Sequence, residues 1–220
     1  PVTSILLAGA LGIVGTLLGT RLALGILVAK GYGQYVRDDG PREHLKKAGT
    51  PTMGGTVIVL STVLAYLLAH LVNWRMPTAS GLLLLFLLVG LGFVGFLDDW
   101  LKISRARSLG LDSKSKLALQ GVISIVFAIL ALQLPDNRGV TPASNYISFL
   151  RDLPGLGLPV ALAVIWIVFI VAAMSNGSNL TDGLDGLATG VSSAVFAAYT
   201  LINVWQYYQD CAYARPGPQC

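Results

Sequence analysis

Asp98 and Asp99 are the residues of this sequence best suited to do chemistry, because they end a long apolar run and precede Lys102 at helical spacing. Two carboxylates about 5 Å apart repel each other by about 3 kcal/mol at an effective dielectric constant near 20. On a helix, Lys102 could meet both. A Mg²⁺ ion held by one or two carboxylates together with substrate phosphates is the other way to offset the repulsion. We therefore predict a catalytic or metal site, with an acidic helix end and a local ion pair as the alternative.

A second polar cluster occupies residues 175–189, SNGSNLTDGLDGLAT. It repeats a polar residue at every third position: Asn176, Asn179, Asp182 and Asp185. A repeat of three drifts by about 60° per step on a straight helix, so these four cannot share one face. Residues 176–179 favour a turn, which predicts that one apolar segment ends there and that the next begins near Thr181 as N-cap. Capping alone accounts for one aspartate, not for the whole cluster.

Basic residues beside apolar runs are candidates to meet phosphate. Lys46 and Lys47 lie next to Thr50 and Thr52 in KKAGTPTMGG, and the alternative for this loop is a basic turn that only sets membrane topology. Lys114 and Lys116 open another apolar run. They could anchor the chain to anionic lipid or bind a phosphate-headed lipid, and the sequence does not separate these two interpretations.

The elements that must position these residues are membrane spans. The chain is 54% hydrophobic and only 12% charged, against about 25% charged residues in soluble domains. We predict an all-α, polytopic transmembrane helix bundle, with residues 1–220 forming a single integral membrane domain. A β-barrel does not fit, because the apolar runs are continuous rather than alternating. Six runs are long enough to cross a bilayer, near residues 4–29, 53–72, 80–97, 117–134, 156–174 and 186–205.

Basic residues also predict the orientation of these spans. The loops at residues 30–51 and 98–116 carry most of the Lys and Arg between spans. Basic loops stay in the cytoplasm, which predicts an external N-terminus. By the same alternation, residues 175–189 are cytoplasmic, so three polar, glycine-rich loops are expected on one face.

Three motifs resemble a known enzyme family. DDWLK at 98–102, NGSNLTDGLDGLATG at 176–190 and KKAGTPTMGG at 46–55 together resemble the polyprenyl-phosphate N-acetylhexosamine 1-phosphate transferases, in particular their phospho-N-acetylmuramoyl-pentapeptide transferase branch. The resemblance implies transfer of phospho-MurNAc-pentapeptide from UDP-MurNAc-pentapeptide to undecaprenyl phosphate. The products would be lipid I and UMP, with Mg²⁺ as cofactor, at the bacterial cytoplasmic (inner) membrane during peptidoglycan synthesis.

The same resemblance implies roles for individual residues. Asp98 would be the base that deprotonates the lipid phosphate, or the nucleophile of a two-step route. Asp99 would lie beside it at the diphosphate and the metal, and Lys102 belongs to the same motif. Lys114 falls where the lipid phosphate is expected. The remaining substrate-binding candidates, most of them at the nucleoside, are Lys47, Thr52, Asn176, Asn179, Asp182, Gly183, Leu184 and Asp185.

The chain departs from the family pattern. Family members have about ten spans, and a further Mg²⁺-binding aspartate and a histidine-rich loop follow the sixth, whereas this chain has only two histidines. We therefore expect the N-terminal portion of such an enzyme, inactive by itself.

Other readings remain open. The alternatives are transfer of N-acetylglucosamine 1-phosphate from UDP-GlcNAc or, in another class, a transporter, which would carry its carboxylates deep within spans. No nucleic-acid partner is expected, and a homodimer stays open. Cys211 and Cys220 could pair in an exterior loop, with free thiols as the favoured alternative.

Overall fold

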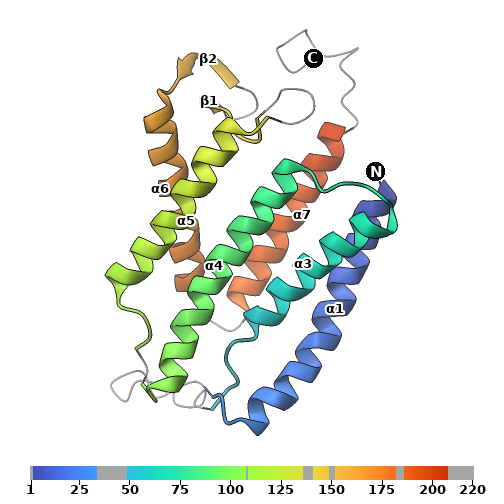
Figure 1. Ribbon diagram of the computed structural model, residues 1–220, viewed down its shortest axis with the longest axis vertical. Coiled ribbons are helices and arrows are strands. Elements are labelled where there is room, and N and C mark those ends of the chain that lie inside the picture. The colour runs from blue at the N-terminus through green and yellow to red at the C-terminus, as the bar shows by residue number, and fades with distance from the viewer. Residues whose placement is uncertain are drawn as a thin grey trace.

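Long helices aligned in a bundle make up most of the structure (Figure 1). The computed structural model describes residues 2–33, 49–107, 109–135, 141–148, 152–181 and 186–207. Within these ranges, six helices are long and apolar enough to cross a membrane. The predicted all-α transmembrane bundle is therefore confirmed. The helices are α1 (Val2–Ala29), α3 (Gly55–Val72), α4 (Ala79–Ser104), α5 (Ser113–Gln133), α6 (Val160–Thr181) and α7 (Leu187–Tyr207).

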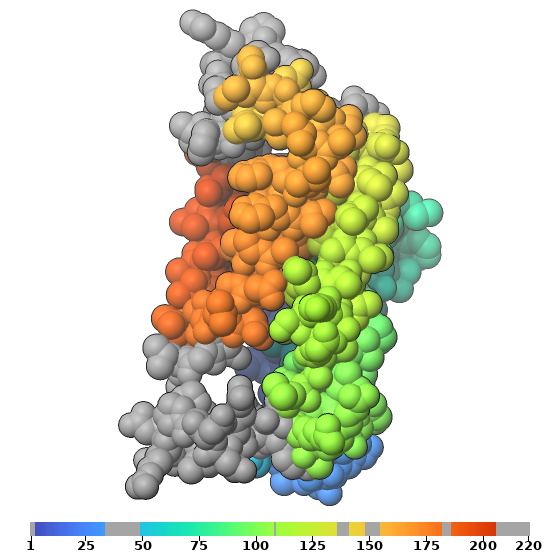
Figure 2. Space-filling model, turned by 90° about the vertical axis from the view of Figure 1, so that its left-hand side faces the viewer, coloured from blue at the N-terminus to red at the C-terminus, as the bar shows by residue number. Residues whose placement is uncertain are grey.

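Successive helices from α1 to α6 pack against one another, and α7 lies beside α6. Figure 2 shows α5 and α6 running side by side along one face. The buried side chains are few and mostly small, such as Ala65, Ala128 and Ala163. Small residues let helix backbones approach closely, which is how helices associate where no water drives apolar burial. The large apolar side chains instead cover the outer surface of the bundle, where lipid would contact them.

Helix α4 extends beyond the predicted span at residues 80–97 and ends at Ser104. A Schellman-type turn ends it: Ala106, at a φ of 48°, donates its N–H to the Ile103 carbonyl at 3.2 Å, and the Arg107 N–H bonds to the Lys102 carbonyl at 3.0 Å. Both aspartates therefore lie on the last turns of a rigid helix, as the sequence predicted. Helix α5 begins at Ser113 rather than at residue 117, which also places Lys114 and Lys116 on a helix.

The expected turn at residues 176–179 is wrong, because α6 continues through it to Thr181. Thr181 is therefore not the N-cap of the next helix; its hydroxyl donates to the Gly177 carbonyl at 2.8 Å, and α7 begins at Leu187. Glycine costs a helix about 1 kcal/mol and asparagine less. An unsatisfied backbone group in an apolar environment costs several kcal/mol, so continued helix is favoured.

A β-hairpin that was not predicted precedes α6. Strands β1 (Tyr146–Ser148) and β2 (Asp152–Gly157) pair antiparallel. Leu156 therefore lies in a strand, and the predicted start of a span at residue 156 is wrong. The helix begins only after Pro159, whose lack of an N–H suits the start of a helix.

The described ends of the helices show which connections lie together. In Figure 1, α1, α4 and α6 end, and α3, α5 and α7 begin, at the lower end of the bundle. The N-terminus, the turn from α3 to α4 and the hairpin lie at the upper end. The three polar segments predicted to share one face therefore connect helices at the same end.

Candidate active site

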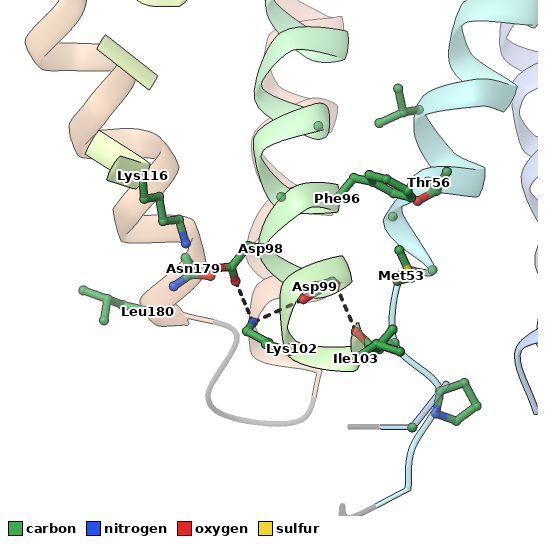
Figure 3. Close-up of a pocket in the computed structure, with 18 residues that line it drawn as sticks. Met53, Thr56, Phe96, Asp98, Asp99, Lys102, Ile103, Lys116, Asn179 and Leu180 are labelled. Carbon is green, nitrogen blue, oxygen red and sulfur yellow. Dashed lines mark hydrogen bonds and ion pairs between the residues drawn. The ribbon is translucent and has the colours of Figure 1, made fainter. Parts of the chain in front are cut away.

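The last turns of α4 hold two carboxylates around one amine (Figure 3). Lys102 Nζ lies 2.6 Å from Asp98 Oδ2 and 3.2 Å from Asp99 Oδ1. The side chains of Asp98 and Asp99 are 14% and 29% exposed. The predicted pairing of Lys102 with both aspartates is therefore present, and it leaves the three side chains with one net negative charge when all are ionised.

Asp98 is also held by the connection between α4 and α5. The Leu111 N–H donates to Asp98 Oδ1 at 2.9 Å. The preceding residue, Gly110, packs so closely that a Cβ atom there would lie 2.5 Å from both the Asp98 carbonyl oxygen and Oδ1. Both oxygens of this carboxylate thus have a donor, one a side chain and the other the main chain.

Asp99 has a different second partner, Thr52, whose hydroxyl donates to Asp99 Oδ2 at 2.9 Å. Thr52 is placed by the segments on either side of residues 34–48. Its N–H bonds to the Tyr32 carbonyl at 3.2 Å, and Gly33 and Pro51 form an isolated antiparallel bridge. The segment before α3 therefore reaches the acidic end of α4.

A cavity of about 770 Å³ opens beside these residues, within the range of about 300–1,000 Å³ typical of ligand sites. It is lined by residues of α3, α4, α5 and α6 and by the segment before α3. Lys116 of α5 and Asn179 of α6 also line it, and Figure 3 shows both to the left of Asp98. The polar or charged side chains that line it include Thr52, Asp98, Asp99, Lys102, Lys116 and Asn179.

The structure brings together only part of the predicted site. Thr52, Asn179 and the three predicted residues of the DDWLK motif, Asp98, Asp99 and Lys102, line the cavity. Two predicted residues do not: Lys114 is exposed on the first turn of α5, and Asn176 faces that helix instead. The predicted residues that lie outside the described ranges are Lys47, Asp182, Gly183, Leu184 and Asp185.

Asn176 belongs to a polar network between α5 and α6. Its amide donates to Gln120 Oε1 at 3.2 Å and to the Ala172 carbonyl at 2.8 Å. Gln120, only 3% exposed, donates in turn to Ser175 Oγ at 3.0 Å. Gln120 was not among the predicted residues. A lone glutamine within an apolar run could have indicated a polar contact between helices at this position.

Lys116 lines the cavity, although Lys114 was the residue expected at the lipid phosphate. Two residues separated by one position point to different faces of a helix, and the start of α5 decides which of them faces inward. Asp112 is the N-cap, and its Oδ2 accepts the Ser115 N–H at 3.4 Å. Hydrogen bonds from the Ser115 side chain and main chain lower the pKa of the exposed Asp112 carboxyl, which keeps the cap ionised.

The donor set at this site fits Mg²⁺ in part. Among the described residues there is no group of three or more His, Cys, Asp or Glu side chains that could hold a metal ion. Asp98 and Asp99 nevertheless supply hard carboxylate oxygens. Mg²⁺ commonly binds one or two carboxylates and completes its shell with water and phosphate oxygens. The two aspartates could therefore hold Mg²⁺ together with a phosphate ligand. They do not by themselves supply a complete coordination shell.

The fold and the site define a multi-pass membrane protein whose charged cavity lies at one end of its helix bundle. Residues 81–215 match the model of glycosyl transferase family 4. Residues 47–59 match phospho-N-acetylmuramoyl-pentapeptide-transferase signature 1. The chain belongs to glycosyl transferase family 4, and the resemblance drawn from its motifs is confirmed.

Similar curated proteins carry the name phospho-N-acetylmuramoyl-pentapeptide-transferase. The protein of Cutibacterium acnes is 58% identical over 209 residues, which cover 95% of this chain and 59% of that protein. The protein of Streptomyces avermitilis is 54% identical over 96% of this chain and 59% of its own length. The protein of Arthrobacter sp. is 54% identical, with 96% and 61% covered. The chain thus spans about three fifths of the length of these relatives.

Proposed function

We propose that this protein transfers phospho-MurNAc-pentapeptide from UDP-MurNAc-pentapeptide to undecaprenyl phosphate, giving lipid I and UMP in peptidoglycan synthesis. The observation that carries the proposal is the placement of Asp98, Asp99 and Lys102 in a cavity at one end of a membrane-spanning bundle. A lipid held in the bilayer and a water-soluble nucleotide can meet only at such an end. The names of the similar proteins supply the transferred group, phospho-N-acetylmuramoyl-pentapeptide.

In this reaction an oxygen of the lipid phosphate attacks the sugar-linked phosphorus of the nucleotide sugar. The bond between the two phosphates of the UDP group breaks, and UMP leaves with the electron pair. The proton of the lipid phosphate passes to Asp98. We assign Asp98 the role of base, and the Lys102 amine and the Leu111 N–H, one at each of its oxygens, hold the carboxylate in place for this role.

The cationic side chains orient and neutralise the phosphates. Lys102 and Lys116 line the same cavity as the aspartates, and positive charge placed around a transferring phosphoryl group stabilises its transition state. Mg²⁺, when bound, would supply further neutralisation of the diphosphate, and Asp99 is the residue we propose to hold it, with Asp98 beside it. Asn179 then remains to position the nucleotide, while Thr52 holds Asp99.

We further propose that the cavity end of the bundle faces the cytoplasm of a bacterial cell and that the N-terminus lies outside. Support comes from the basic residues of the segments at this end, which include Lys30, Arg105, Arg107, Lys114 and Lys116. UDP-linked sugars are cytoplasmic substrates, so this orientation and the proposed reaction require each other.

The test uses protein expressed from its complete gene, purified in lipid nanodiscs and supplied with undecaprenyl phosphate and Mg²⁺. We expect UMP release with UDP-MurNAc-pentapeptide and none with UDP-GlcNAc. Asp98→Asn should lower kcat by about 10²-fold or more, while Asp112→Asn, which keeps a capping side chain outside the cavity, should retain it. Turnover of UDP-GlcNAc alone would overturn the substrate assignment, and ion flux into liposomes without UMP release would indicate a transporter.

A further inference from the structure

We propose that the main chain at Gly110 and Leu111 positions the Asp98 carboxylate for reaction. This inference rests on the proposed function, in which Asp98 is the base. Gly110 and Leu111 are positioning residues, because they act on the substrate only through Asp98. Neither residue has a side chain that could take part in the chemistry, so motif-based reasoning overlooks both.

The first observation is steric. A Cβ atom on Gly110 would lie 2.5 Å from Asp98 Oδ1 and 2.8 Å from Asp98 Cγ, well inside van der Waals contact. Gly110 is not among the glycines with positive φ, so an alanine would meet no backbone strain there. Glycine is therefore required at position 110 because Asp98 is so close, through its carboxylate and, equally, through its main-chain carbonyl oxygen at 2.5 Å.

The second observation is the hydrogen bond of 2.9 Å from the Leu111 N–H to Asp98 Oδ1. A main-chain donor cannot change rotamer, so it restricts the carboxylate more tightly than a lysine can. Lys102, the donor at the other oxygen, is shared with Asp99 and is itself one-third exposed. The Leu111 N–H is thus the contact that distinguishes Asp98 from its neighbour.

The connection is anchored on both sides of this contact. The turn at Ala106 ends α4 and reverses the chain. Asp112, directly after Leu111, caps α5 through Ser115. The Leu111 N–H that binds the Asp98 side chain therefore directly precedes the capped start of α5. Enzymes gain much of their rate from holding a catalytic group in reactive geometry, and a shift of about 1 Å can cost about 10²-fold.

The experiment compares Gly110→Ala with Gly121→Ala in the protein expressed from its complete gene. A Cβ at Gly121 in α5 would meet nothing within 4 Å, which makes it a matched control. We expect Gly110→Ala to lower kcat by about tenfold or more while KM for the nucleotide sugar stays within about twofold, the pattern of a lost transition-state interaction. Gly121→Ala should change neither constant.

A second variant tests the hydrogen bond without adding any atom near Asp98. Incorporating the α-hydroxy analogue of leucine at position 111 replaces the amide by an ester, which removes the donor and keeps the side chain. We expect kcat to fall about tenfold, as for loss of a hydrogen bond to a charged group, with the thermal unfolding midpoint little changed. If Gly110→Ala fails to fold, the kcat of the ester variant alone tests the positioning role of the Leu111 N–H.

The outcomes separate this inference from the proposed function. An active wild-type protein whose ester variant keeps full kcat would overturn the positioning role alone. Equal loss of kcat in Gly121→Ala and Gly110→Ala would also overturn it, because the effect would then not depend on contact with Asp98. A wild-type protein that releases no UMP would overturn the proposed function and, with it, this inference.

Discussion

Two neighbouring aspartates differ in this structure through their partners rather than their chemistry. Asp98 is held by the main chain of Leu111, and Asp99 by the hydroxyl of Thr52. Both share Lys102. The sequence predicted the shared lysine, because helical spacing suffices for it. It could not predict Thr52 or Leu111 as partners of these aspartates, since neither contact follows from spacing along one helix.

The role of Thr52 can be tested by Thr52→Val, which keeps the shape and removes the hydroxyl. Hydrogen bonds to charged groups contribute about 1.5–3 kcal/mol, so we expect a loss of about 10- to 100-fold in kcat/KM. Thr62→Val is the control, because that exposed hydroxyl bonds to the Ile58 carbonyl of its own helix. Unchanged kinetics in Thr52→Val would show that Asp99 does not need this donor.

Ala106 offers a test of stability. Its φ of 48° lies in the left-handed region, which costs an L-residue about 1–2 kcal/mol. After the greater entropy of glycine in the unfolded chain is subtracted, Ala106→Gly should stabilise the fold by about 0.5–1 kcal/mol. The unfolding midpoint should rise by about 1–4 °C. Ala118→Gly, at an exposed position within α5, should lower it instead.

At the scale of elements, the junction of α5 and α6 shows where sequence reasoning fails. Residues 176–179 favour a turn when only local propensity is considered. In the bundle, Asn176 bonds to Ala172 and Gln120, so its amide is satisfied within a continuous helix. Local propensities are small beside the cost of leaving backbone groups unpaired away from water. The end of α6 could therefore not be predicted without its neighbour α5.

A double-mutant cycle with Gln120→Met and Asn176→Leu measures this junction. Hydrogen bonds between membrane helices average about 0.6 kcal/mol and reach about 1.7 kcal/mol, and we expect a coupling free energy of unfolding in that range. Thr200→Val on α7, whose hydroxyl bonds to the Phe196 carbonyl of the same helix, paired with Gln120→Met should show no coupling. A cycle with additive effects would mean that the network does not join α5 to α6.

For the molecule as a whole, the number of spans could be predicted from the length of the apolar runs. The grouping of the polar loops at one end could be predicted because successive connections alternate between the two ends of the bundle. The lining of the cavity could not be. Lys116 lines it and Lys114 does not, a difference that depends on where α5 begins. The β-hairpin also escaped prediction, because Leu156 continues the apolar run into α6.

The two ends of the bundle can be distinguished by cysteine labelling from opposite sides of the membrane. Arg75 follows α3 at the upper end, and Ser113 begins α5 at the cavity end. With Cys211 and Cys220 replaced by Ser, we expect Arg75→Cys to react with an impermeant maleimide in right-side-out vesicles. Ser113→Cys should react only after permeabilisation. The reverse pattern would contradict the proposed orientation, and labelling of both from one side would contradict the fold.

The contact between the α4–α5 connection and Asp98 has a consequence for mutational tolerance. At position 110 every replacement adds a Cβ atom, whereas at position 111 every natural replacement except proline keeps the N–H that Asp98 accepts. A saturation scan under selection for growth should therefore find adjacent codons with opposite behaviour, one intolerant of nearly all changes and the other permissive apart from proline. Substitutions tolerated in this segment should accordingly fall at position 111 and spare position 110.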